Sequence, residues 1–79
     1  MLKERRENDM NYIVYDLELN SKPFKSTIPN EIIEIGAIKL DDNLCKIDTF
    51  NSFIKPKYFK KLFPVVKRKT NISQEDINN

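Results

Sequence analysis

The feature that most constrains the fold is a short apolar run near the N-terminus that contains two acidic residues. The run from Tyr12 to Leu19 is rich in β-branched and aromatic side chains, and its carboxylates, Asp16 and Glu18, are two positions apart. Because residues i and i+2 of a strand point to the same face, we expect both carboxylates to stand side by side where the strand leaves the core. The rest of the run is apolar on both faces, which favours a central place in a sheet.

The same two carboxylates indicate a site for a hard cation. Acids held close together on rigid backbone do not comfortably both stay ionised unless Mg²⁺ or Mn²⁺ supplies compensating charge. Acids at the end of a strand are, however, more commonly just solvated. The spacing alone therefore leaves both interpretations open.

Composition limits the class of protein. With 79 residues, of which 39% are hydrophobic, the chain fits one small globular domain. A single cysteine, Cys45, and the absence of histidine exclude an intramolecular disulfide and a zinc site. No run approaches the roughly 18–20 apolar residues of a membrane span, and residues 1–10 are charged where a signal peptide would be apolar. We expect residues 1–10 to be a mobile tail on a cytoplasmic domain that has no membrane partner.

Hydrophobic patterning predicts an α/β domain built on a three-stranded antiparallel meander. β-Branched and apolar runs separated by loop-forming residues place the strands at about 12–19, 31–40 and 44–54. The turn Asp41–Asn43 is so short that the last two strands must be antiparallel neighbours.

Two short helical segments are expected after the strands. The first covers Tyr58–Phe63 and ends at Pro64, and the second begins after Ser73, a residue type that caps helices well. The second helix would have only about a turn and a half before Asn79, and a helix that short is not stable by itself in water. We therefore expect residues 11–79 to be the N-terminal part of a longer domain.

Several short motifs occur in an order that resembles a known enzyme family. They are the D-x-E pair at Asp16 and Glu18, the run Glu31–Ile38 (EIIEIGAI), the strand end Phe53–Pro56 and the helix entry Thr70–Ser73. This order resembles the N-terminal part of the DEDD-type, DnaQ-like 3′-5′ exonucleases. The sequence of the segment Pro29–Gly36 is similar to that found in the branch of the family that contains the sporulation-inhibitor and RNA-trimming exonucleases.

The resemblance implies an RNase H-like fold with strand order 3-2-1-4-5 and metal-dependent hydrolysis of single-stranded DNA or RNA ends. In such enzymes two divalent ions, Mg²⁺ or Mn²⁺, sit about 3.5–4 Å apart and act on the scissile phosphate. Asp16 would ligate both ions, and Glu18 the one that activates water. Leu19 and Asn20 stand where the family usually contacts the terminal nucleotide. The family's two further acids and its general base would lie beyond Asn79, so the isolated chain is predicted to be inactive.

Glu34 and a basic stretch are weaker candidates. Glu34 is interpreted either as a hydrogen-bonding group close to the metal ligands or, preferably, as a partner of a lysine or backbone amide on the opposite sheet face. Between Lys55 and Lys69 the chain has seven basic residues and no acid, with three aromatic residues among them. Lys67, Arg68 and Lys69 could contact phosphates there, or the stretch could be a solvated face whose aromatic rings turn inward.

An alternative function and an assembly prediction complete the sequence-based picture. The chain could be a truncated or degenerate relative that binds nucleic acid or protein without catalysis, indifferent to Mg²⁺ and Mn²⁺. Without a fourth strand the edge from Tyr12 to Leu17 would lie open. An unpaired apolar edge favours a homo-oligomer formed by strand addition or swapping.

Overall fold

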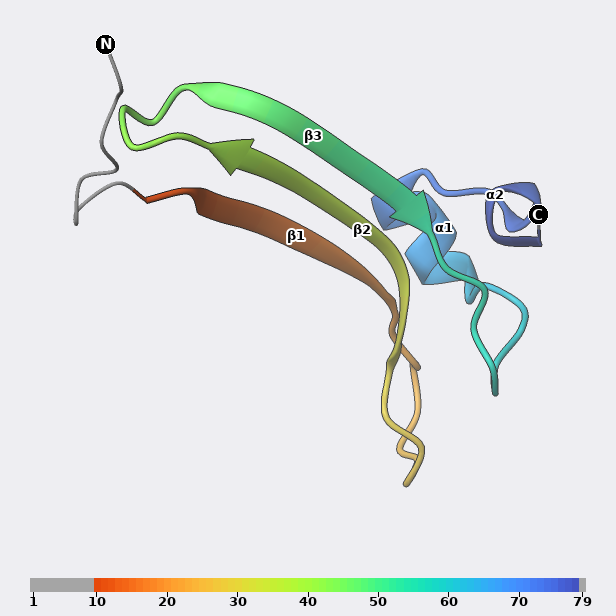
Figure 1. The fold of residues 1–79 in the computed structure, drawn as a ribbon. Coiled ribbons are helices and arrows are strands. Elements are labelled where there is room, and N and C mark those ends of the chain that lie inside the picture. The colour runs from red at the N-terminus through yellow and green to blue at the C-terminus, as the bar shows by residue number, and fades with distance from the viewer. Residues whose placement is uncertain (1–9, 79) are drawn as a thin grey trace, which may run out of the picture.

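The computed structural model describes residues 10–78, and the expected mobile tail lies outside this range except for Met10. Its three strands are β1 (Tyr12–Asn20), β2 (Glu31–Leu40) and β3 (Lys46–Phe53), and its helices are α1 (Pro64–Thr70) and α2 (Gln74–Asn78). The strands form one antiparallel sheet in the order β1-β2-β3 (Figure 1). The predicted meander is confirmed.

The first strand lies at an edge of the sheet and not at its centre. Within residues 10–78, β1 pairs only with β2, and β2 is the central strand. The order β1-β2-β3 nevertheless matches the 3-2-1 half of the strand order that the family resemblance implies. A strand that is apolar on both faces is thus left with much of its surface uncovered in the described part of the chain.

The hairpin between β2 and β3 is a tight turn closed by Asp41. The Asp41 carboxylate accepts hydrogen bonds from the backbone N–H groups of Asn43 and Cys45, both at 2.9 Å. Leu44 follows the turn with φ 62°, the left-handed conformation that such three-residue loops require and that glycine usually supplies. Because Leu44 and Cys45 belong to the turn, β3 starts at Lys46 and is shorter than the predicted strand at 44–54.

The helical turn predicted at Tyr58–Phe63 is wrong. The segment Lys57–Phe63 is irregular, because its backbone groups bond to side chains from other elements instead of to one another. The helix begins where the prediction ended it: Pro64 is the first residue of α1, a position where its missing N–H costs nothing.

Both helices end or begin on local signals that the sequence carries. α1 stops at Asn71, whose φ of 61° is the positive value expected of asparagine in place of glycine, and its N–H bonds to the Lys67 carbonyl. α2 has the predicted cap: the Ser73 hydroxyl accepts the Asp76 N–H at 3.2 Å, and the Asp76 carboxylate accepts the Ser73 N–H at 2.8 Å. No helix among residues 10–78 is long and apolar enough to cross a membrane.

The hydrophobic core gathers at one end of the sheet. Its buried members are Ile33 on β2 and four residues of the C-terminal segment, Leu62, Val66, Ile72 and Ile77. The rest of the sheet extends past this core, so the Cα radius of gyration is 17.7 Å, against about 11 Å for a compact domain of this length. Both helices lie by the end of the sheet where β3 finishes (Figure 1).

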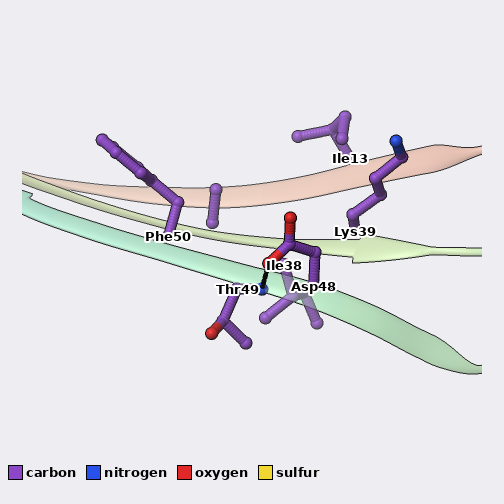
Figure 2. Close-up of a pocket in the computed structure, with 7 residues that line it drawn as sticks. Ile13, Ile38, Lys39, Asp48, Thr49 and Phe50 are labelled. Carbon is purple, nitrogen blue, oxygen red and sulfur yellow. Dashed lines mark hydrogen bonds between the residues drawn. The ribbon is translucent and has the colours of Figure 1, made fainter.

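The far half of the sheet exposes apolar side chains. Ile13, Tyr15 and Phe50 are each about 60% exposed. Figure 2 shows Ile13 and Phe50 on one side of the sheet and Thr49 on the other, as the strand alternation requires. Ile13, Thr49 and Phe50 are among the residues that line an open hollow of about 150 Å³.

Candidate active site

Asp16 and Glu18 lie on the same face of β1, near the end of the strand that approaches α1. In the strand register Asp16 is opposite Gly36, and Glu18 is opposite Glu34. Asp16 is exposed and Glu18 is half-buried. A β-bulge follows directly, between Glu18 and Leu19, and bulges commonly re-aim side chains next to functional sites. The side-by-side arrangement predicted from the spacing of the two acids is present.

The neighbouring strand places a glycine opposite Asp16 and adds a third acid beside Glu18. Gly36 has no side chain, and a Cβ placed on it would lie 3.3 Å from the Oδ1 atom of Asn51. Asn51 Nδ2 donates a hydrogen bond of 3.1 Å to Oε2 of Glu34. Glu34 is thus held on the same face as the two strand acids by a side-chain amide of β3.

The preferred interpretation of Glu34 does not match this geometry. Its hydrogen-bond partner is the side chain of Asn51 on the same face, and not a lysine or a backbone amide on the opposite face. Directly across from Glu18, it is placed where a hydrogen-bonding group close to metal ligands would stand. Whether it acts on such ligands stays a prediction.

The donor set at Asp16 and Glu18 fits part of a divalent-cation site. Neither carboxylate has a hydrogen-bond or ion-pair partner within residues 10–78, and carboxylate oxygens are the ligands that Mg²⁺ and Mn²⁺ prefer. In the same range, no group of three or more acidic or cysteine side chains is close enough to hold a metal by itself. The described residues therefore supply a partial ligand set, to which Glu34 is the nearest addition by register.

An open hollow lies beside Glu18, between β1 and α1. It measures about 300 Å³ and is lined by Glu18 and Leu19 on one side and by Val65, Lys69 and Thr70 on the other. Leu19 is 38% exposed. The hollow thus brings a predicted substrate-contacting residue, a predicted metal ligand and a predicted phosphate contact, Lys69, to one place.

Asn20, the other predicted substrate contact, has a structural set of partners. It is 2% exposed. Its Nδ2 atom donates to the carbonyls of Phe59 and Lys61 at 3.2 and 3.1 Å, and its Oδ1 accepts the Phe63 N–H at 3.0 Å. The substrate contact at Asn20 stays a prediction, but the side-chain amide is turned into the protein and bound there.

The predicted phosphate contacts Lys67, Arg68 and Lys69 are exposed in the last turn of α1. Positive charge there also stabilises the C-terminal end of a helix, so their presence has an explanation without nucleic acid. The aromatic residues of the basic stretch divide in two. Phe59 and Phe63 pack with each other and with Phe24, with ring centroids 5.5–5.8 Å apart, whereas Tyr58 is 57% exposed.

Sequence reasoning missed Glu31, which holds the loop that precedes α1. Its carboxylate accepts the N–H groups of Lys57, Tyr58 and Phe59 at 2.6, 2.9 and 2.9 Å. Burial raises the pKa of Glu31, but these three hydrogen bonds and the charge of Lys22 together outweigh it, so the pKa lies below its usual value. The sequence offered little indication of this contact, since Glu31 lies at the start of β2 and the loop that it binds follows β3.

Solved structures with the same arrangement of elements are nuclease domains. The nuclease domain of 3′hExo, a DEDDh family member bound to rAMP, aligns with a TM-score of 0.80 and 21% identity over 95% of this chain and 38% of that chain. A 3′-exonuclease that recognises the 3′ end of the histone mRNA stem-loop gives 0.77 and 22%, over 87% of this chain and 32% of that chain. Cell-death related nuclease 4 gives 0.77 and 24%, over 87% of this chain and 24% of that chain.

These similarities define the fold as the RNase H-like fold of DEDD exonuclease domains. The chain spans between about a quarter and two fifths of the length of each matched chain. No curated protein matches the sequence. The exonuclease family model RNase_T matches residues 13–79. The chain therefore belongs to the RNase_T exonuclease family.

Proposed function

We propose that this chain supplies the first metal-binding motif of a divalent-metal-dependent 3′-5′ exonuclease that acts on single-stranded DNA or RNA ends. The observation that carries the proposal is the pair Asp16 and Glu18, which share one face of β1 and have no cation partner in the described chain. Family membership supports nuclease chemistry. The matched nucleases that bind rAMP or a histone mRNA stem-loop support a nucleic-acid substrate.

The residues of this chain would hold ions and orient the end of the substrate. Asp16 and Glu18 are fixed on a strand, which gives two carboxylates at a set separation, and phosphodiester cleavage depends on positioned charge more than on covalent help. Bound divalent ions would activate water and stabilise the charge that develops on the phosphate. Leu19 offers an apolar surface to the terminal nucleotide in the hollow beside Glu18, and Lys69 offers a positive charge.

The isolated chain is proposed to be inactive, because the acids brought together within residues 10–78 do not form a complete metal site. Incubation of the 79-residue chain with a labelled single-stranded oligonucleotide and Mn²⁺ should release no nucleotides. Hydrolysis that Asp16→Ala abolishes would contradict this expectation.

Metal binding separates this proposal from a non-catalytic binding module. Substoichiometric Mn²⁺ should broaden the amide resonances around Asp16, Glu18 and Gly36 more than those elsewhere, since paramagnetic broadening reports even weak ligation. The double variant Asp16→Asn/Glu18→Gln should remove the effect. Asp48→Asn is the matched control, because Asp48 is an exposed carboxylate of β3 that is opposite Lys39 in the register, away from Gly36 and Glu34, which pair with Asp16 and Glu18. Uniform broadening that the double variant leaves unchanged would favour the module.

A further inference from the structure

Two loops that are distant in sequence meet at the end of the sheet where β1 finishes. They are residues 21–30, between β1 and β2, and residues 54–63, between β3 and α1. Phe24 of the first loop contacts Phe59 and Phe63 of the second at centroid distances of 5.8 and 5.7 Å. Glu31 and Asn20 fix the second loop to the ends of β2 and β1. The two loops therefore form one surface, which we call the basic lobe.

The basic lobe concentrates positive charge without acidic residues. Its six lysines are Lys22, Lys25, Lys55, Lys57, Lys60 and Lys61, and neither loop contains aspartate or glutamate. The nearest carboxylate, Glu31, is occupied by three backbone N–H groups. The opposite end of the sheet has Asp41, Asp42 and Asp48 together with Lys39 and Lys46. Among residues 10–78, unbalanced positive charge is thus concentrated at the end of the sheet that carries the lobe.

Exposed aromatic rings accompany the lysines. Tyr58 is 57% exposed, and Phe24 is 51% exposed although it packs against Phe59 and Phe63. The Lys57 ammonium lies 5.4 Å from the centroid of the Tyr58 ring. In the first loop an open hollow of about 470 Å³ lies between Lys22, Lys25 and Asn30. A face that is merely solvated does not need large exposed rings between its lysines, whereas single-stranded nucleic acid uses both, charge for the backbone and rings for the bases.

The basic lobe is continuous with the candidate active site. Asn20 is two residues after Glu18 on β1, and its side chain bonds to the backbone of Phe59 and Lys61 within the lobe. A nucleic-acid strand whose end lies at Asp16 and Glu18 can therefore pass along the end of β1 directly onto the lobe. The positive charge of the lobe complements the phosphate backbone of such a strand.

We propose that the basic lobe binds single-stranded nucleic acid and holds the nucleotides that follow the end presented to Asp16 and Glu18. The position of the bound end rests on the proposed function. Binding to the lobe itself does not, since it needs neither metal nor the strand carboxylates. Phosphate contacts come from the lysines, and Tyr58 stacks on a base.

The test compares two charge-matched double variants of the full chain by fluorescence anisotropy with a labelled oligothymidylate in EDTA. Lys25→Gln/Lys60→Gln removes two exposed lysines of the lobe, and Lys39→Gln/Lys46→Gln removes two lysines at the opposite end of the sheet. For single strands each lost phosphate contact lowers the slope of log affinity against log salt by about 0.7. The lobe variant should therefore lose about 1.4 from the slope, and the control variant should keep it.

Equal slopes for the two double variants would overturn the proposal, because the loss would then reflect net charge alone. Tyr58→Leu should weaken single-strand binding about fivefold or more and leave the affinity for a duplex of equal charge unchanged. Displacement of the oligonucleotide by polyglutamate as effectively as by unlabelled oligonucleotide would also overturn it, since the lobe would then recognise any polyanion. Asp16→Asn/Glu18→Gln should bind at least as tightly in EDTA as the unaltered chain, because it removes two negative charges beside the bound end and leaves the lysines of the lobe in place. Failure of the metal site and failure of the lobe are therefore distinguishable.

Discussion

Asn20 and Glu31 are register partners at the ends of β1 and β2, and both side chains bind the same segment of backbone. Glu31 accepts three N–H groups from Lys57–Phe59, and Asn20 bonds to the backbone of Phe59, Lys61 and Phe63. From the other side Gln74 of α2 donates to the Lys60 carbonyl and accepts the Leu62 N–H, both at 2.8 Å. The irregular segment that leads into α1 is therefore satisfied by side chains instead of by secondary structure.

The first prediction concerns Asn20. Asn20→Ala leaves two carbonyls and one N–H of a partly buried segment without partners, so the free energy of unfolding should fall by about 2–4 kcal/mol. Urea denaturation followed by circular dichroism measures this. Asn51→Ala is the matched control, since Asn51 is exposed and makes its hydrogen bond to a side chain; it should cost less than about 1 kcal/mol. An equal loss in the free energy of unfolding for the two variants would show that the hydrogen bonds of Asn20 to the segment before α1 contribute no special stability.

The lowered pKa of Glu31 makes stability depend on pH. Because the folded pKa lies below the unfolded value, about 4.3 for glutamate, the stabilisation is fully present above that value and is lost as pH falls through the folded pKa. Urea midpoints measured from pH 6 down to pH 3 should decline, and Glu31→Gln should flatten part of the decline. Glu75→Gln, which removes an exposed carboxylate of α2, should leave the decline in place.

Features encoded by neighbouring residues could be predicted from the sequence. Strand alternation placed β1 and β2 to within a residue, the D-x-E spacing put Asp16 and Glu18 on one face, and Ser73 with Asp76 marked the start of α2. Each depends on contacts within a few residues or on strand periodicity. The positive φ at Asn71 likewise suits a residue type that visits the left-handed region more readily than most.

Features that depend on distant partners could not be predicted. Lys57–Phe63 has a composition that allows a helical turn, and only the arrival of Asn20, Glu31 and Gln74 explains why it forms none. The partner of Glu34 was likewise decided by the register of β3, which brings Asn51 beside it. Family membership supports nuclease chemistry for the chain, and the roles of Asp16 and Glu18 as metal ligands belong to the proposed function.

The turn at Leu44 offers a gain in stability. Leu44 is 65% exposed and has φ 62°, a conformation that a leucine adopts at a cost and that asparagine visits readily. Leu44→Asn should therefore raise the free energy of unfolding by roughly 0.5–1 kcal/mol. Asn43→Leu, at the preceding position of the turn, is expected not to stabilise, since Asn43 is not among the positive-φ residues. A lower urea midpoint for Leu44→Asn would contradict this.

The metal-ligand assignment predicts an effect on activity in a chain that continues past Asn79 and cleaves oligonucleotides. There Asp16→Asn and Glu18→Gln should each lower kcat by a factor of about 10² or more, because each removes charge that positions an ion. The fold should persist, since both side chains lack partners in the described residues. Full activity in the double variant would remove the assignment. Asp48→Asn serves again as the control that should leave kcat unchanged.

The edge of β1 predicts self-association of the 79-residue chain. Among the described residues both edges of the sheet are unpaired, but they differ in chemistry. Tyr12–Tyr15 is an apolar, half-exposed run without charge, whereas β3 carries Lys46 and Asp48, the kind of charge that discourages pairing. A second copy is therefore expected to add to the β1 edge, and light scattering coupled to gel filtration should report a dimer or higher assembly.

Two matched variants identify the edge that pairs. Val14 on β1 and Ile47 on β3 are both 52% exposed, so a lysine at either position adds the same charge to a strand of similar exposure. Val14→Lys should shift the chain to monomer, because it would place like charges close together across a β1–β1 pair, whereas Ile47→Lys should leave the assembly intact. The opposite pattern would assign the assembly to β3. A monomeric unaltered chain at all concentrations, with slow amide exchange from Tyr12 to Leu17, would show that this edge is protected within a single copy.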